Sequence, residues 1–566
     1  MTQYLLSLLV FIPLIASVLI LFIPENKTLL FKTITLFVNL LQLALAGLMY
    51  IQADATQTGV HDESTFQFVE RSNWITLNMG SAGKLSIDYF VGVDGLSIPL
   101  VLLSAIVLVI GAISSWSVEK KAKGYFALYL LLSSTIVGCF VALDMFLFYL
   151  FFEFMLLPMY FLIGIWGGER REYAAIKFFI YTLVGSVFIL IVMIGLYISV
   201  IDPSATAMES GLSGNNAITQ VQQRVAAGTV ESSKLVHTFD MLAMMNVKNY
   251  IPGSFLHPAS TTSIFGIPAR LLAFLLVFIG FAVKLPVVPL HTWLPDAHVE
   301  APTPISVILA GILLKIGAYG FLRIAYSIFP EGGLHYAWLV GLLGVISIIY
   351  GACNALAAHD MKRMIAYSSV SHMGFVLIGL ASVTAEGVSG AVFQLFSHGV
   401  LSALLFLIVG VLYDRTHDKQ IENYRGLAGK MPVYTSVVIV AFFASLGLPG
   451  FSGFIGELFA LTGAFGSAYL PKWMAILSMG GLILGAAYFL WTLQGMFFGT
   501  FWVSGGSAWQ IQLTDLSARE KLMMVSLAVL GIVFGLFPGL LLDVMESSVA
   551  QFVKLVIETN NTANIP

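Results

Sequence analysis

Four ionisable side chains lie inside, or at a break in, long apolar segments of the sequence: Glu153, Lys284, Lys315 and Glu457. A charged group near the centre of a bilayer costs roughly 2.5 to 3.5 kcal/mol on insertion scales, so such residues need internal partners or water. Intramembrane residues of this kind mark ion pathways and proton relays. The sequence therefore predicts a track that moves charge through a membrane.

Each of these groups also has a plainer interpretation. Glu153 has no basic residue within one helical turn, so it either pairs with a residue of another helix, for which Lys284 is the natural choice, or stays protonated. A Glu–Lys pair holds the lysine charged when close and lets it release a proton when separated, which makes a gate. Lys315 lies too deep to reach an interface, and nearby carbonyls or hydroxyls are its alternative partners. Glu457 could instead cap a helix that resumes near Gly456.

Two histidines lie within apolar segments, where they could connect Lys315 to Glu457. His372 and His398 are candidates because histidine is the side chain that titrates near physiological pH, although each could be a hydrogen-bonded packing residue. His291 and His298 lie in the segment HTWLPDAHVEAP with acidic neighbours. No matching ligand cluster occurs elsewhere in the sequence. A role at the entrance of the charge path, or a structural role, is therefore favoured over a metal site.

Two apolar segments contain helix breakers at corresponding places. Residues 274–291 carry two prolines directly after Lys284, and each removes a backbone donor and clashes with the preceding turn. Residues 437–461 are interrupted by glycines and a proline within a run too long for one straight span. The sequence AVKLP at 282–286 aligns with SLGLP at 445–449. Paired interruptions point to inverted repeats with an ion site at their interface.

The composition is that of a polytopic membrane protein. Hydrophobic residues make up 58% of the 566 residues and charged residues only 10%, against about 25% in soluble domains. The net charge of -3 gives no indication of a nucleic-acid partner. Cys139 and Cys353, the two cysteines, lie far apart in or at the ends of apolar stretches. We expect buried thiols, and neither a disulfide framework nor a cysteine-ligated cluster is supported.

Apolar runs near the spanning length of about 20 residues number about fourteen. They cover residues 3–24, 29–50, 89–115, 125–142, 145–166, 173–201, 267–289, 303–329, 336–358, 362–382, 388–413, 432–466, 473–499 and 521–542. The predicted fold is all-α, with two inverted five-helix repeats that each contain a broken helix. Its parts are three N-terminal spans (1–115), a first repeat (125–329) with an extramembrane insertion (202–262), a second repeat (336–499), and a C-terminal span with a tail (500–566).

The basic residues of short loops set the expected orientation, since cytoplasmic loops carry the excess of lysine and arginine. They fall in alternate loops: Lys27, Lys32, Lys120, Lys121, Lys123, Arg170, Arg171, Lys177, Lys362, Arg363, Arg415, Lys419, Arg425, Lys430, Arg519 and Lys521. Both termini are therefore expected on the non-cytoplasmic side. The first segment lacks a basic start and a small-residue cleavage site, so we expect a retained helix rather than a signal peptide.

Motifs for redox or hydrolytic chemistry are missing from the sequence. There is no G-x-G-x-x-G after a strand, no phosphate-binding lysine loop and no cysteine cluster. We expect no cofactor and no metal in this chain. The energy that drives the charges would have to come from a partner.

Three blocks carry a resemblance to a known family. They are FAVKLPVVPLHTWLPDAHVEAPTPISVILAGILLKIGAYGFLRI (281–324), HDMKRMIAYSSVSHMG (359–374) and GLPGFSGFIGE (447–457). They resemble the antiporter-like subunits of proton-translocating NADH:quinone oxidoreductase, respiratory complex I, and the likeness extends over nearly the whole chain. The family also includes subunits of Mrp-type cation/proton antiporters, which stay open as the alternative, and of membrane hydrogenases.

The resemblance implies a function and a setting. Glu153 would pair with Lys284, Lys315 would be central, His372 and His398 would carry the proton onward, and Glu457 would lie at the outlet. Glu457 matches the branch of the family that has glutamate instead of lysine in the second broken helix. The chain would be a membrane-arm subunit of the enzyme in a bacterial cytoplasmic membrane, beside two other antiporter-like chains. FMN, iron–sulfur clusters and quinone would be held by other subunits, and the sequence would end a turn or two past its last span.

Overall fold

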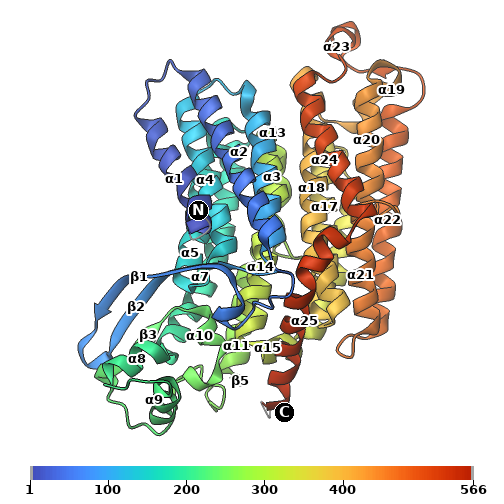
Figure 1. Cartoon of the computed structure of the whole chain (residues 1–566). Helices are drawn as coiled ribbons and strands as arrows, with labels where there is room; N and C mark the ends of the chain where they lie inside the picture. The colour runs from blue at the N-terminus through green and yellow to red at the C-terminus, as the bar shows by residue number, and fades with distance from the viewer. Residues whose placement is uncertain (1–3, 563–566) are drawn as a thin grey trace.

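The computed structural model describes the backbone of residues 4–562 and the side chains of all these residues except 82 and 559–562. It consists mainly of helices that run side by side (Figure 1). Ten helices in this part of the chain are long and apolar enough to cross a membrane, or eleven if the bent pair α24–α25 counts as one span. The expected membrane class and mainly helical fold are therefore confirmed.

The helices fall on the apolar runs of the sequence. The ten long ones are α2 (Thr28–Gln52), α3 with its continuation (Ile98–Ser117), α4 (Ala122–Val141), α5 with α6 (Met145–Trp166), α7 (Arg171–Ser199), α13 to η8 (Thr303–Tyr326), α16 (Ala337–Leu356), α17 (Met361–Ala381), α18 (Ala385–Thr416) and α22 (Lys472–Phe497). Shorter apolar helices are α1 (Leu5–Leu21), α11 (Ala269–Lys284) and α20 (Pro432–Ser445).

A small sheet joins the two long polar connections, at about residues 52–97 and 202–262. The all-α prediction did not include this sheet. Strand β2 (Lys84–Val93) pairs antiparallel with β1 (Gln67–Asn78) and parallel with β3 (Val236–Thr238). The helix expected over 89–115 is therefore wrong at its start, and α3 begins only at Ile98. The reason is the local sequence LSIDYFVGV, whose β-branched and aromatic residues favour a strand once a partner strand is present.

The segment 202–262 is ordered and has a small core of its own. It contains α8 (Pro203–Glu209), α9 (Ala217–Ala226) and α10 (Met241–Met245). Buried apolar side chains gather here: Ile201, Ala207, Val221, Val225 and Leu235. The sheet and these helices form a layer at one end of the molecule, opposite α19 (Leu427–Lys430) and α23 (Gly506–Gln512) (Figure 1).

The C-terminal segment is helical well beyond the last span that the sequence predicted. Helix α24 (Ala518–Leu536) bends by 62° into a second helix, α25 (Gly539–Thr562), where the sequence predicted only a short tail. Its buried residues recur at helical spacing: Leu541, Met545, Val549, Phe552 and Val556. This stripe packs α25 against α15 (Pro330–His335) and α18, and the Ser548 hydroxyl accepts a hydrogen bond from the Gly95 amide at 3.0 Å.

A carboxylate of the sheet layer caps the first helix. Glu70, on β1, is buried and accepts hydrogen bonds from the amides of Leu6 (2.8 Å) and Ser7 (3.2 Å). These amides lie in the first turn of α1, where backbone donors have no partner within the helix. A negative charge at this end also interacts favourably with the helix dipole.

Loss of this cap should weaken the attachment of α1. We expect Glu70→Ala to lower stability by about 0.5 to 2 kcal/mol, the usual effect of removing a side-chain cap. The measurement is the midpoint of thermal unfolding of the purified chain in detergent. Glu119→Ala, at an exposed loop position, is the control. Equal midpoints for the two variants would show that the cap does not anchor the helix.

Candidate functional site

Lys315 lies at the centre of the candidate site, on a helix that is irregular on both sides of it. Helix α14 (Leu314–Gly320) is flanked by π-helical stretches at Leu309–Leu313 and Phe321–Tyr326. Such bulges occur mostly at functional sites. The ammonium of Lys315 donates to the carbonyl of Ala310 and lies 2.8 Å from Nδ1 of His398. The carbonyl partner expected as an alternative is thus present together with the histidine.

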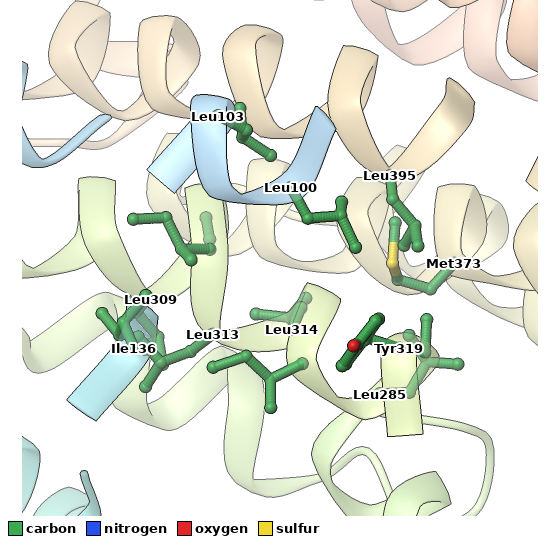
Figure 2. Close-up of a cluster of buried hydrophobic side chains, with 14 of the residues drawn as sticks. Leu100, Leu103, Ile136, Leu285, Leu309, Leu313, Leu314, Tyr319, Met373 and Leu395 are labelled. Atoms are coloured by element: carbon green, nitrogen blue, oxygen red, sulfur yellow. The ribbon is translucent and has the colours of Figure 1, made fainter. Parts of the chain in front are cut away.

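The surroundings of this lysine are apolar. Leu309, Leu313 and Leu314, on the same continuous helix as Lys315, belong to a cluster of buried apolar side chains that also includes Ile136, Leu285 and Met373 (Figure 2). Lys315 itself is fully buried. Electrostatic interactions are stronger in such low-dielectric surroundings than in water, so a small change near the ammonium changes its charge state readily.

A second hydrogen-bonded pair lies on the neighbouring helices. His372 on α17 has its Nδ1 2.9 Å from Oε1 of Glu457, which lies on α21 (Ser452–Gly466). The side-chain amide of Gln394 on α18 lies 3.5 Å from each of these two groups. All three side chains are buried, so this is a second closed polar group within the apolar interior.

The two pairs approach each other through the histidines. The ring centroids of His372 and His398 are 5.5 Å apart. Beside them is a cavity of about 10 Å³ whose polar lining includes Ser368, Gln394 and Ser402. About this volume is needed to hold one water molecule. Lys315, His398, His372 and Glu457 therefore form one line, with room for a single bridging water in its middle.

Ser368, Gln394 and Ser402, which lie beside this line, were missed in the sequence, although their spacing from the predicted histidines gives a signal. Gln394, His398 and Ser402 follow one another at intervals of four along α18, so they share one helix face. Ser368 lies four residues before His372 on α17 in the same way. Polar side chains at this spacing within an apolar helix mark a polar stripe, which a search for charged residues alone overlooks.

Glu153 and Lys284 do not form the direct ion pair that was expected. Lys284 is buried, its ammonium has no hydrogen-bond partner among the described residues, and it lies over the rings of Phe152 (5.0 Å) and Phe178 (5.5 Å). Glu153 is half-buried on α5 beside Tyr149. Aromatic faces attract a cation, and here they hold the lysine apart from the carboxylate.

The first predicted break is present directly after Lys284. Helix α11 ends at this residue, and a second helix, α12 (Trp293–Glu300), begins only after an irregular stretch. The indole of Trp293 donates to the carbonyl of Val283 at 2.8 Å. A carbonyl freed by the break is thus satisfied inside the protein, as irregular backbone at membrane depth requires.

The second predicted break is also present, between α20 and α21. Helix α20 ends at Ser445 and α21 begins at Ser452, so this break starts two positions earlier in the aligned motif than the first. Glu457 lies well inside α21. The alternative that it caps a helix starting near Gly456 is therefore wrong, because the helix begins a full turn earlier.

Gly447 in the second break leaves room for the carboxylate of Glu457. Its φ is +78°, and a Cβ atom there would lie 2.6 Å from Oε2 of Glu457. Gly450 has a similar backbone, with φ +96°, but a Cβ there would meet nothing within 4 Å. The two glycines therefore carry the same backbone strain on substitution and differ in their contact with the site.

We expect Gly447→Ala to lower the stability of the chain more than Gly450→Ala does. Both changes introduce a strain of about 1 to 3 kcal/mol at positive φ, but only the first displaces Glu457. The measurement is the midpoint of thermal unfolding of the purified chain in detergent. Equal midpoints for the two variants would show that the contact with Glu457 does not matter.

The family of the chain follows from its sequence. The model of the transmembrane family "NADH:quinone oxidoreductase/Mrp antiporter" matches residues 142–225 and 225–485, which include both breaks and the whole line. The chain belongs to this family.

Members of the family with similar length include subunit M of the NADH-quinone oxidoreductase of Rickettsia bellii, which is 39% identical over 97% of this chain and 98% of its own. Subunit M of Rhodobacter capsulatus is 38% identical over 98% of this chain and 97% of its own. Respiratory complex I from Thermus thermophilus contains a chain with a TM-score of 0.76 and 29% identity, covering 98% of this chain and 100% of that one. The Mrp complex of Dietzia has a chain with TM-score 0.74 and 19% identity, covering 98% of this chain and 99% of that one, which shows a shared fold.

Two further candidate histidines of the sequence, His291 and His298, are not members of the line. His298 is fully buried, and its ring stacks on Phe406 with 4.4 Å between centroids. His291 lies against Tyr350 at 5.1 Å. Within residues 4–562 no group of three or more histidine, cysteine or acidic side chains is placed to hold a metal ion. The expectation of two buried thiols is wrong for Cys353, which is exposed, while Cys139 is buried.

Proposed function

We propose that this chain is the M-type, antiporter-like subunit in the membrane arm of a proton-translocating NADH:quinone oxidoreductase. The two bacterial relatives described above match over nearly the whole chain and are named subunit M of NADH-quinone oxidoreductase, and the sequence resemblance implies a glutamate at position 457 in this branch of the family. The observation that carries the proposal is the buried line in which Lys315 contacts His398 and His372 contacts Glu457. A chain with this line and no redox motif is suited to moving protons rather than electrons.

The proposed architecture has about fourteen spans, about three before two inverted five-helix repeats and one after them. The boundaries are those expected from the sequence, at 125–329 and 336–499. Two broken helices, α11–α12 and α20–α21, support the repeats. The subunit lies in a bacterial cytoplasmic membrane with both termini on the non-cytoplasmic side. The sheet layer and α25 are then also non-cytoplasmic, opposite the basic loop around α19 (Figure 1).

The proposed path runs along the line. A proton on Nζ of Lys315 passes to Nδ1 of His398, crosses the small polar cavity to His372, and reaches Glu457 at the outlet. Moving one charge against 100 mV costs about 2.3 kcal/mol. This is comparable to one hydrogen bond to a charged group, about 1.5 to 3 kcal/mol. A modest rearrangement next to Lys315 is therefore sufficient to drive the step.

Glu153 and Lys284 are proposed as the control of this step. In the present structure Lys284 lies against aromatic rings and apart from Glu153. Gly317, on the Lys315 helix, packs directly on α11, because a Cβ there would lie 2.8 Å from the amide of Leu285. A movement of Lys284 toward Glu153 is therefore passed to the helix of Lys315 through a close backbone contact.

The driving reaction takes place elsewhere in the proposed complex. FMN, iron–sulfur clusters and the quinone site are assigned to other subunits, and this chain is proposed to contact the two other antiporter-like chains and the lipid bilayer. Its own polar residues hold and move protons.

The test compares the proposed function with the Mrp-type alternative in inverted vesicles that contain the complex. We expect acidification to depend on NADH and quinone and not on a sodium gradient. Glu457→Gln should lower acidification while NADH oxidation by an artificial electron acceptor stays at the wild-type rate, because the redox groups are on other subunits. Acidification driven by a sodium gradient without NADH would favour the antiporter and contradict the proposal.

A further inference from the structure

A surface pocket of about 600 Å³ lies between the ends of α16 and α22. A short segment covers it on one side, formed by η9 (Ile421–Asn423) and β6 (Tyr424–Arg425). Sites for ligands of drug-like size have volumes of about 300 to 1,000 Å³. The pocket is therefore large enough to hold part of an organic molecule.

The open side of the pocket continues into apolar helix faces. On α22, Trp491 is 66% exposed and Ile483 73% exposed, and on α16 Tyr350 is 42% exposed. Faces of this kind on spanning helices meet hydrocarbon. Tryptophan and tyrosine are enriched where a membrane meets water, and Trp491 and Tyr488 line the pocket itself. The pocket therefore lies at the level of lipid headgroups, at the end of the molecule that carries the basic loops.

The rim of the pocket carries both signs of charge. The guanidinium of Arg425 is exposed and makes no ion pair or hydrogen bond with any residue between 4 and 562. Glu422 lies on the same covering segment, with Oε1 2.7 Å from Nδ1 of His359. Its second carboxylate oxygen remains able to accept another donor. An unpaired cation and an available carboxylate thus stand side by side above an apolar cavity.

We propose that this pocket binds one phosphatidylethanolamine molecule of the membrane. The phosphate meets the guanidinium of Arg425, whose planar donors match phosphate oxygens. The primary ammonium donates to Glu422, and an acyl chain follows the apolar faces of α16 and α22. Phosphatidylglycerol has no cation for Glu422, and the choline headgroup has no N–H to donate to it. The rim therefore selects the zwitterionic lipid with a primary amine.

Cys353 offers a reporter within this pocket. Its thiol is exposed and lines the cavity, whereas Cys139 is buried. A lipid chain in the pocket covers this thiol, so its alkylation should slow when the site is occupied. None of the lining residues belongs to the line from Lys315 to Glu457, although Tyr488 on the inner wall interacts with Ser368 and Glu457.

The experiment uses the assembled complex in nanodiscs that contain a phosphatidylethanolamine with a diazirine on its acyl chain. After illumination we expect labelled peptides around residues 353–358 and 488–495. Arg425→Gln and Glu422→Gln should each lower this labelling about tenfold, which corresponds to one charged hydrogen bond. Lys430→Gln, an exposed basic position outside the pocket, is the control. Alkylation of Cys353 should be slower in phosphatidylethanolamine than in phosphatidylcholine nanodiscs, and this difference should vanish in Glu422→Gln, which removes the carboxylate that distinguishes the two headgroups.

Several results would overturn the proposal. One is equal labelling of these peptides by a phosphatidylglycerol probe, and another is labelling unchanged in both rim variants. A third is a Cys353 thiol that stays unreactive in every lipid and receives no photolabel, since a partner subunit would then cover the pocket.

Discussion

Replacing Lys315 with methionine is expected to lower NADH-driven proton pumping and coupled quinone reduction by at least about tenfold, since positioned acid–base groups typically contribute about 10² to 10⁴. Methionine keeps the length and fills the buried site, so the change removes the proton carrier with little loss of packing. Without the ammonium, His398 has no proton donor on the Lys315 side of the line.

The measurement combines acidification of proteoliposomes with the rate of quinone reduction, at equal content of assembled complex. Lys472→Met, an exposed lysine at the start of α22, is the matched control and should keep wild-type rates. Reduction of an artificial acceptor by NADH should be unchanged in both variants. Wild-type pumping in Lys315→Met would exclude this residue from the proton path.

The second large effect concerns stability and is expected for Arg323→Met. Arg323 and Asp94 form an ion pair at 2.7 Å, and both side chains are almost fully buried. Arg323 also donates to the hydroxyl of Tyr319 at 3.1 Å. Removing one partner of a buried pair leaves an uncompensated charge and costs about 3 to 5 kcal/mol. We therefore expect the subunit to be lost from the membrane arm at growth temperature.

The amount of subunit in purified complex measures this loss, and a double variant separates its causes. Arg323→Met with Asp94→Asn removes both charges and should restore most of the assembly, because neutral replacement of a buried pair is often nearly neutral in stability. Arg224→Met on the exposed face of α9 is the control for loss of an arginine. A double variant as poorly assembled as the single one would show that the unpaired charge is not the cause.

The sequence predicted the residues of the proton line but not their contacts. Lys315, His372, His398 and Glu457 stand out because ionisable side chains in apolar runs are expensive. The contacts arise between four different helices, and helical spacing within one helix carries no information on which faces meet. The π-helical stretches around Lys315 were likewise not predicted, since no residue type marks them.

The breaks were predicted for a strong local reason. Prolines after Lys284 and the glycines around Gly447 act on their own backbone, so their effect does not depend on the rest of the fold. The absence of a Glu153–Lys284 contact has a tertiary cause instead, because the ammonium of Lys284 on α11 lies over the rings of Phe152 on α5 and Phe178 on α7. Two opposite charges in a sequence do not show which aromatic side chains lie between them in the folded protein.

Secondary structure was predicted wrongly where hydropathy was the only evidence. Residues 89–93 continue an apolar run that was assigned to a span, but they form part of strand β2 because β1 supplies a partner strand. Helix α25 was missed because its mean hydropathy is low, although Leu541, Met545 and Phe552 mark one apolar face. A helix that lies against a protein surface needs only such a stripe.

The rate of NADH-driven proton pumping in single and double variants tests the central claim most directly. If Lys315 and Glu457 act in series along one line, Lys315→Met, Glu457→Gln and the double variant should lower this rate by the same amount, since groups that act as a unit are not additive. Losses in the double variant that equal the sum of the two single losses would place these residues on separate paths and contradict the line from Lys315 through His398 and His372 to Glu457.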